Sequence, residues 1–158
     1  MKFHFLSSNN PEAKNTEKKL TELFGQNSVE DADYIIPIGG DGLLLKSLHN
    51  FNKLNKPFFG INFGSIGFLM NNLSNENLND MIINAKKSTF KPLKMTAQSV
   101  NDEIFEAYAY NEVSLMRQTH LASKIKIKIN EKIKMEELIC DGVLLSTSAG
   151  STAYNLSA

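Results

Sequence analysis

A short apolar run that leads directly into a glycine-rich turn limits what this chain can fold into. Residues 34–38 (YIIPI) have the character of a buried strand, and Gly39-Gly40-Asp41-Gly42 follows them without a break. Residues 43–54 are amphipathic and predict a helix. Glycines between a strand and a helix let backbone N–H groups approach phosphate oxygens at the positive end of the helix. The segment therefore predicts a phosphate-binding loop, although a plain tight turn would use the same residues.

An aspartate inside such a loop is unusual, because its carboxylate repels a bound phosphate. Asp41 makes sense in this position if the carboxylate meets a metal ion or the proton of a hydroxyl group. Phosphoryl transfer depends on alignment and on neutralisation of charge rather than on a covalent nucleophile. The combination of glycines and one carboxylate therefore points to phosphoryl transfer onto an alcohol, with Asp41 as the candidate catalytic residue.

The first half of the chain alternates between strand and helix patterns. Strands are expected at residues 2–6, 34–38 and 58–61, and Pro37 favours an edge or a strand end. Helices are expected after Asn10-Pro11, over residues 43–54, and from a cap at Ser74 to about residue 86. This order predicts a Rossmann-like α/β domain with a mostly parallel sheet, which binds ligands at the carboxyl ends of its strands.

The pattern changes near residue 88 to the alternation of antiparallel strands. Residues 124–129 alternate lysine with isoleucine, which predicts one wet face and one buried face. Asn101-Asp102 and Asn130-Glu131 stand where hairpin turns would fall. We expect an α/β domain over residues 1–92 and an all-β, sandwich-like domain over residues 93–158. The second domain is expected to be incomplete, because its strands are few and a helix that begins at Ser151 has little room to bury an apolar face.

Composition narrows the class of ligand. The 17 basic and 17 acidic residues cancel, which argues against a partner that is nucleic acid or a membrane surface. One cysteine, Cys140, fits a reducing compartment, and no apolar run has the length of a membrane span. His4, His49 and His120 lie far apart, which argues against a protein-bound metal. A cytoplasmic protein is expected.

Four stretches, in this order, resemble motifs of the NAD kinase family, the ATP- or polyphosphate-dependent NAD 2′-kinases. They are GGDG at 39–42, GINFGSIGFL at 60–69, Asn111-Glu112, and Asp141-Gly142 followed by GSTAY at 150–154. GGDG is shared with phosphofructokinases and with diacylglycerol and sphingosine kinases, whereas GSTAY after Asp-Gly is more specific. The resemblance covers the chain from about residue 35 to its last residue.

The resemblance implies roles for the matched residues. Asp41 would hold the 2′-hydroxyl of the adenosine ribose of NAD and help remove its proton as the γ-phosphoryl group of ATP arrives. Asp141 would contact the nicotinamide end, in the family often across a subunit interface. The other nucleotide-binding residues that it implies are Gly39, Gly40, Gly42, Asn62, Asn111, Glu112, Thr152, Ala153, Tyr154 and Ser157. Mg²⁺ would arrive with ATP, and a homo-oligomer (dimer or tetramer) would form through a full β domain.

The chain also departs from the family's pattern. Ser65 stands where a basic or bulkier polar residue is common, and Leu43 stands where a hydroxyl residue is frequent. The family continues well beyond GSTAY, so a chain of only these 158 residues would lack part of the enzyme. Two other functions stay open: a GGDG-group kinase that acts on a lipid or a sugar alcohol, and a non-catalytic fragment that binds NAD(P).

Overall fold

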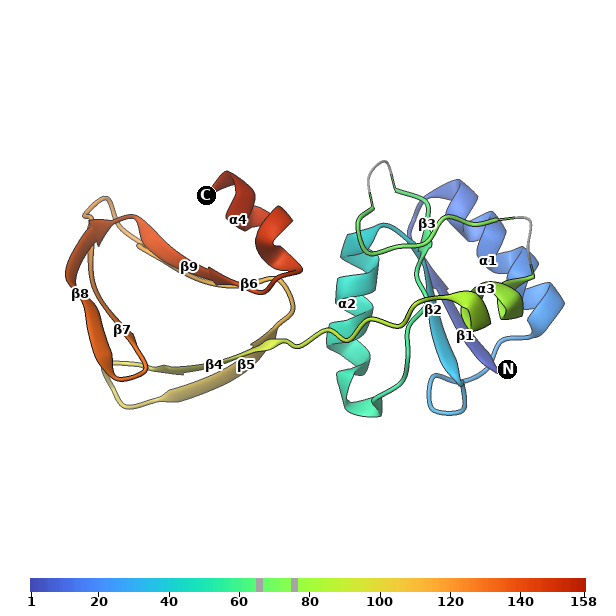
Figure 1. Cartoon of the computed structure of the whole chain (residues 1–158), viewed down its shortest axis with the longest axis horizontal. Helices are drawn as coiled ribbons and strands as arrows, with labels where there is room; N and C mark the ends of the chain where they lie inside the picture. The colour runs from blue at the N-terminus through green and yellow to red at the C-terminus, as the bar shows by residue number, and fades with distance from the viewer. Residues whose placement is uncertain (65–66, 75–76) are drawn as a thin grey trace. The chain divides into compact units, whose positions relative to one another are not determined.

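The computed structural model describes residues 1–64, 67–74 and 77–158 (Figure 1). The chain divides into two compact units, Met1–Ser88 and Thr89–Ala158, which we call the N-terminal and C-terminal units. The N-terminal unit combines a parallel sheet with helices, and the described strands of the C-terminal unit pair in antiparallel fashion. This arrangement confirms the predicted fold class, an α/β part followed by a β part.

The N-terminal unit is built on a sheet of three parallel strands in the order β1-β2-β3. The strands are β1 (Phe3–Ser7), β2 (Tyr34–Gly39) and β3 (Ile61–Asn62). The helices that follow the strands are α1 (Pro11–Phe24), α2 (Asp41–Phe51) with the 3₁₀ turn η1 (Asn52–Leu54), and α3 (Leu78–Asn84). Because the strands are parallel, their carboxyl ends share one edge of the sheet, where Gly39 and Asn62 lie.

The core of this unit lies between the sheet and helices α1 and α3. Alternate residues of the strands, such as Phe5 and Ile36, point to this face and are almost fully buried. Leu20 of α1 and Ile82 of α3 cover them. The opposite face carries His4, whose ring meets Phe51 of α2 edge-on, so helices cover both faces of the sheet as predicted.

Pro37 is not at an edge of the described sheet. Its strand, β2, lies between β1 and β3, so the edge alternative in the prediction is wrong. Proline has no N–H to donate, and the pairing of β2 toward β3 is correspondingly interrupted. Ile35 bridges to Phe58 before the proline, and Ile38 pairs with Ile61 after it. The central position is tolerated because the next strand bonds to β2 only on either side of the proline.

The predicted helix cap at Ser74 is also wrong. Helix α3 begins at Leu78, and the Asn77 side chain accepts a hydrogen bond from the Asn79 N–H. Asparagine is as good a cap as serine, and a capping residue must stand directly before the first helical residue. At the first helix the prediction is confirmed, because Asn10 caps α1 and Pro11 occupies its first position.

Strand β1 lies at the edge of the described sheet, where side chains bond to its outward-facing backbone groups. The Gln26 amide donates to the Phe5 carbonyl at 2.9 Å and accepts from the Phe5 N–H at 3.0 Å. The Asn27 amide donates to the Phe3 carbonyl in the same way. A single glutamine thus pairs with Phe5 as a neighbouring strand would, which blocks this edge against another strand.

Replacing Gln26 with alanine is expected to lower the free energy of unfolding by about 1–2 kcal/mol, because two hydrogen bonds to Phe5 are lost. Urea denaturation followed by circular dichroism measures the change. Lys18→Ala is the matched control, since its pair with Glu22 on α1 is long (4.0 Å) and exposed. Such a pair contributes close to nothing. Equal midpoints for the two variants would contradict the role of Gln26.

The C-terminal unit consists of three two-stranded antiparallel sheets, which pair β4 (Leu93–Gln98) with β5 (Ile104–Ala109), β6 (Glu112–Met116) with β9 (Gly142–Ser146), and β7 (Ser123–Ile129) with β8 (Lys132–Cys140). In Figure 1, β4–β5 and β6–β9 form two layers, and β7–β8 lies at one end of them. The 3₁₀ turn η2 (Gly150–Thr152) and helix α4 (Tyr154–Ser157) follow β9.

The hairpin turns of this unit lie where the sequence predicts them. Asp102 in the β4–β5 turn has φ of 63°, and Asn130 and Glu131 between β7 and β8 have φ of 49° and 64°. Two successive positive φ values are what a tight hairpin turn requires. The isoleucine face of β7 is only partly covered, because Ile125 and Ile127 are half-buried and Ile129 is exposed.

Candidate functional site

The predicted phosphate loop lies at the carboxyl end of β2 and at the start of α2. Gly39 ends the strand, Gly40 caps the helix with extended backbone (φ −109°, ψ 179°), and Asp41 is the first helical residue. A Cβ on Gly39 would lie 3.0 Å from the Leu43 side chain and 3.1 Å from the Ser8 side chain, so a larger residue there would require these side chains to shift. Gly42 has open space around it, which leaves its backbone accessible to a ligand.

The Asp41 carboxylate is held by backbone amides of the segment after β3. Its Oδ2 accepts from the Phe68 N–H at 2.9 Å, and its Oδ1 accepts from the Leu69 N–H at 3.2 Å. The first turn of a helix also stabilises negative charge. These partners, which sequence reasoning missed, offset the charge that was expected to need a metal or a hydroxyl. A carboxylate has about four acceptor positions, so Asp41 keeps acceptor capacity for a ligand.

Asn62 organises the same segment. Its Oδ1 accepts from the Gly64 N–H at 3.0 Å, and a Cβ on Gly67 would meet its side chain at 3.0–3.3 Å. The neighbouring Phe63 N–H donates to the Gly39 carbonyl at 2.7 Å. The structure therefore brings Asn62 together with the phosphate loop and gives it a structural role. Ser65 lies outside the described residues.

In the C-terminal unit, Thr147 joins the Asn111 segment to the GSTAY segment. The Thr147 N–H donates to the Asn111 carbonyl at 2.7 Å, and its hydroxyl donates to the Tyr110 carbonyl at 2.6 Å. The same hydroxyl accepts from the Gly150 N–H at 3.0 Å. Partial burial raises the pKa of the Tyr110 phenol above its ordinary value.

Gly150 packs directly on Asn111. A Cβ at position 150 would lie 2.1 Å from the Asn111 carbonyl oxygen, closer than any real contact. The glycine of GSTAY is therefore required because two backbone segments touch there. The structure thus brings Asn111, a predicted site residue, against the first residue of the GSTAY motif.

Glu112, which follows Asn111, has one carboxylate oxygen without a hydrogen-bond partner among the described residues. It begins β6, where it pairs with Ser146 of β9. Its Oε2 is buried and makes no hydrogen bond with any described residue. A buried carboxylate oxygen without a donor costs free energy, so it points to a ligand that supplies one. A ribose hydroxyl is a suitable donor.

The GSTAY residues after Gly150 extend toward Met116, which lies at the end of β6 away from Glu112. Thr152 ends η2, and the Ala153 N–H donates to the Gly150 carbonyl. The Tyr154 hydroxyl lies 3.9 Å from the Met116 sulfur, and its side chain is about half exposed. Met116 stands four positions after Glu112 on β6, so the two side chains share a face of the strand, the face on which Tyr154 lies. The Ser157 hydroxyl bonds within α4 to the Tyr154 carbonyl.

Asp141 lies at the end of the β6–β9 ladder opposite Glu112. Glu112 pairs with Ser146, and Asp141 stands five residues before Ser146, opposite Arg117, which separates the two positions by about 16 Å along the strands. Asp141 forms an ion pair with Arg117, from Nε to Oδ1 at 2.5 Å. Sequence reasoning gave Arg117 no role, although it is the one arginine of the chain and directly follows β6.

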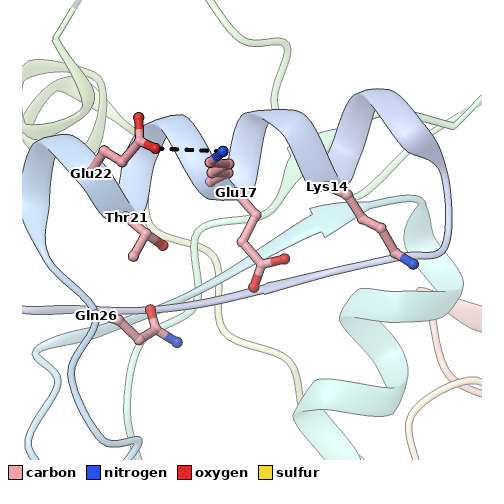
Figure 2. Close-up of a pocket in the computed structure, with 6 residues that line it drawn as sticks. Lys14, Glu17, Thr21, Glu22 and Gln26 are labelled. Carbon is pink, nitrogen blue, oxygen red and sulfur yellow. Dashed lines mark ion pairs between the residues drawn. The ribbon is translucent and has the colours of Figure 1, made fainter.

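Two surface hollows of the described ranges involve neither the phosphate loop nor the surroundings of Glu112. The hollow lined by Lys14, Glu17 and Gln26 lies beside α1 (Figure 2), and another lies between the segment after β3 and α3. Neither is lined by a residue that the sequence analysis placed in the site. No three His, Cys, Asp or Glu side chains in the described ranges converge as metal ligands. No helix in those ranges has the length and apolarity to cross a bilayer.

A family model described as "ATP-NAD kinase N-terminal domain" matches residues 1–82, just over half of the chain. The chain belongs to the NAD kinase family. An NAD kinase from Brucella suis biovar 1 (strain 1330) is 48% identical over 155 residues, which are 98% of this chain and 60% of the relative. One from Rickettsia typhi (strain ATCC VR-144 / Wilmington) is 48% identical over 141 residues, 89% of this chain and 55% of the relative. This NAD kinase family member thus spans about 60% of the length of the curated relatives it matches.

Solved structures of the family agree with this fold. An NAD kinase from Archaeoglobus fulgidus, solved in complex with ATP, matches with a TM-score of 0.70 and 27% identity, covering 100% of this chain and 65% of that one. A yeast NADH kinase solved with NADH matches with a TM-score of 0.66 at 20% identity, covering 99% and 57%. The second likeness shows the fold alone, and the first also fits the family assignment.

Proposed function

We propose that the protein transfers the γ-phosphoryl group of ATP to the 2′-hydroxyl of the adenosine ribose of NAD, which makes NADP. The buried, unpartnered Oε2 of Glu112 carries this proposal, because it requires a hydroxyl or N–H donor next to Asn111 and Gly150. Membership of the NAD kinase family supports the identity of that donor as a nucleotide ribose.

Each group of residues has its own task in this reaction. Asp41 accepts the proton of the 2′-hydroxyl as that oxygen forms its bond to the γ-phosphorus. The bond from the γ-phosphorus to the bridging oxygen breaks, and ADP leaves. Gly39, Gly40 and Gly42 give the phosphates access to backbone N–H groups at the start of α2. Asn62 maintains the conformation of the segment that holds Asp41.

The residues of the C-terminal unit bind the dinucleotide. Asn111 binds polar atoms of the adenine, and Glu112 accepts from the ribose hydroxyls. Thr152, Ala153 and Tyr154 form the adenine pocket, to which Ser157 adds a hydroxyl. Asp141 contacts the nicotinamide end of the dinucleotide.

Mg²⁺ enters this proposal as part of the substrate. ATP phosphate oxygens hold it, with water or one carboxylate, because Mg²⁺ commonly keeps several of its waters. Polyphosphate is a second possible phosphoryl donor. We place the reaction in the cytoplasm, where ATP and NAD are available. We also propose a homo-oligomer, since the exposed side chains of Phe105, Leu115 and Leu145 leave apolar surface on the C-terminal unit.

Incubation with NAD, ATP and Mg²⁺ tests the proposal directly, with NADP formation as the readout. Faster phosphorylation of a diacylglycerol or a sugar than of NAD would favour the wider GGDG group of kinases. Binding of NAD by calorimetry without any turnover would favour a non-catalytic NAD(P)-binding chain. Absence of both NAD binding and NADP formation would contradict the proposal.

Replacing Glu112 with glutamine is expected to raise the KM for NAD about 10- to 100-fold, because hydrogen bonds to a charged acceptor contribute about 1.5–3 kcal/mol. Steady-state kinetics at varied NAD measures this. Glu137→Gln is the control, since that carboxylate lies on β8 in an exposed pair with Lys124. An unchanged KM for NAD in the Glu112→Gln variant would remove Glu112 from the site.

A further inference from the structure

Arg117 makes three hydrogen bonds, two to Asp141 and one to the Thr119 carbonyl. Its backbone N–H donates to the Asp141 carbonyl at 2.9 Å, which extends the β6–β9 ladder by one pair. Its Nε donates to Asp141 Oδ1, and its Nη1 donates to the Thr119 carbonyl. The guanidinium group therefore connects the end of β9 to the turn that follows β6, and its orientation is fixed by both acceptors.

This pair differs from an ordinary surface salt bridge. Isolated exposed pairs contribute little, because two mobile side chains must be ordered to form them. The Arg117 side chain is 33% exposed and also donates to the Thr119 carbonyl, whereas the Asp141 side chain is 74% exposed. The arginine thus serves as a fixed support for a carboxylate that extends into solvent. Asp141 Oδ1 accepts from Arg117, whereas Oδ2 accepts no hydrogen bond from the described residues and is available to accept from a ligand.

We propose that Arg117 is a positioning residue, which fixes the rotamer of Asp141 so that Oδ2 meets an amide N–H of the dinucleotide's nicotinamide end. This inference rests on the proposed function, in which Asp141 binds that end of NAD. Arg117 acts through Asp141 and does not itself touch the adenosine half, because the Glu112 end of the ladder is about 16 Å away.

The geometry requires arginine rather than any cation. Nε and Nη1 of one planar group donate in two fixed directions, one to a carboxylate and one to a backbone carbonyl. A lysine ammonium supplies charge near Asp141 but not this fixed pair of directions. Arg117→Lys is therefore expected to lose less affinity for NAD than Arg117→Met.

Three variants test the inference. Arg117→Met removes both contacts, Arg117→Lys keeps the charge, and Lys126→Met is the matched control. Lys126 forms a 2.7 Å ion pair with Glu136 between β7 and β8, away from the β6–β9 ladder. For each variant, steady-state kinetics gives kcat and the KM for NAD, and calorimetry gives the affinity for NAD and for AMP. AMP carries the adenosine without the nicotinamide.

We expect Arg117→Met to raise the KM and the Kd for NAD about tenfold, with AMP affinity and kcat within twofold of the unmutated protein. The KM and the Kd of Arg117→Lys for NAD are expected to lie between those of Arg117→Met and those of the unmutated protein. Lys126→Met is expected to leave the affinities for NAD and for AMP unchanged. In an Asp141→Asn background, Arg117→Met is expected to add less than a twofold change, because the two residues act as a unit.

The opposite results overturn the inference. Equal losses of AMP and NAD affinity would give Arg117 a general structural role, and an undiminished effect in the Asp141→Asn background would separate it from Asp141. If the unmutated protein binds NAD without making NADP, the proposed reaction fails while the Kd comparison still tests Arg117. A protein that binds AMP and not NAD overturns both proposals.

Discussion

Asp41→Asn is expected to lower kcat at least about 100-fold, the typical contribution of a general base. The amide cannot take the proton of the 2′-hydroxyl. It also has one acceptor oxygen, whereas the carboxylate accepts from both the Phe68 and the Leu69 N–H. Initial rates of NADP formation at saturating NAD and ATP measure the loss, and a thermal melt of the same sample measures the structural cost.

A series of variants separates the chemical role of Asp41 from its hold on the segment after β3. Asp41→Ala removes both hydrogen bonds, while Asp41→Asn keeps one, so their stabilities should differ by about 1 kcal/mol with little difference in rate. Asp31→Asn is the control, because Asp31 is exposed and accepts from the Ser28 hydroxyl. A rate for Asp41→Asn above a tenth of the unmutated rate would leave Asp41 with the structural role alone.

The fold of the N-terminal unit follows closely from local patterns. Asn10-Pro11 and Gly25 mark the ends of α1, because a cap and a left-handed residue (Gly25 φ 76°) are determined by a few neighbouring residues. Pro37 and Ser74 were placed wrongly for opposite reasons. The central position of Pro37 depends on how a distant segment pairs, and the start of α3 depends on which of several capping residues the tertiary structure selects.

The candidate site was predictable as a set of residues and not as a set of contacts. Motif resemblance picked out Asp41 and Glu112, yet the amides that hold Asp41 come from residues 27 and 28 positions further along the chain. Backbone groups leave no trace in a residue pattern, so these partners could not be read from the sequence. Arg117 left a signal, as a lone arginine beside a strand end, but its partner Asp141 is 24 residues away.

Gly150→Ala is expected to disrupt the β6–β9 end of the C-terminal unit and to abolish measurable NAD binding. The added Cβ would lie 2.1 Å from the Asn111 carbonyl oxygen and 2.5 Å from its carbon, so backbone must move. Overpacking of this kind costs about 1–3 kcal/mol. The movement also breaks the Thr147 contacts to Asn111 and Gly150, which position Glu112. Calorimetry with NAD and hydrogen exchange of β6 and β9 amides measure the two effects.

Gly42→Ala is the matched comparison, because it is the same substitution at a glycine with nothing within 4 Å of the added Cβ. Gly42 lies in the first turn of α2, where alanine is a better helix former than glycine by up to about 1 kcal/mol, so this variant should be at least as stable as the unmutated protein. A Gly150→Ala protein with unchanged exchange at β6 and β9 would mean that the two backbones can separate at no cost. Glycine at position 150 would then serve the ligand rather than the packing of Asn111.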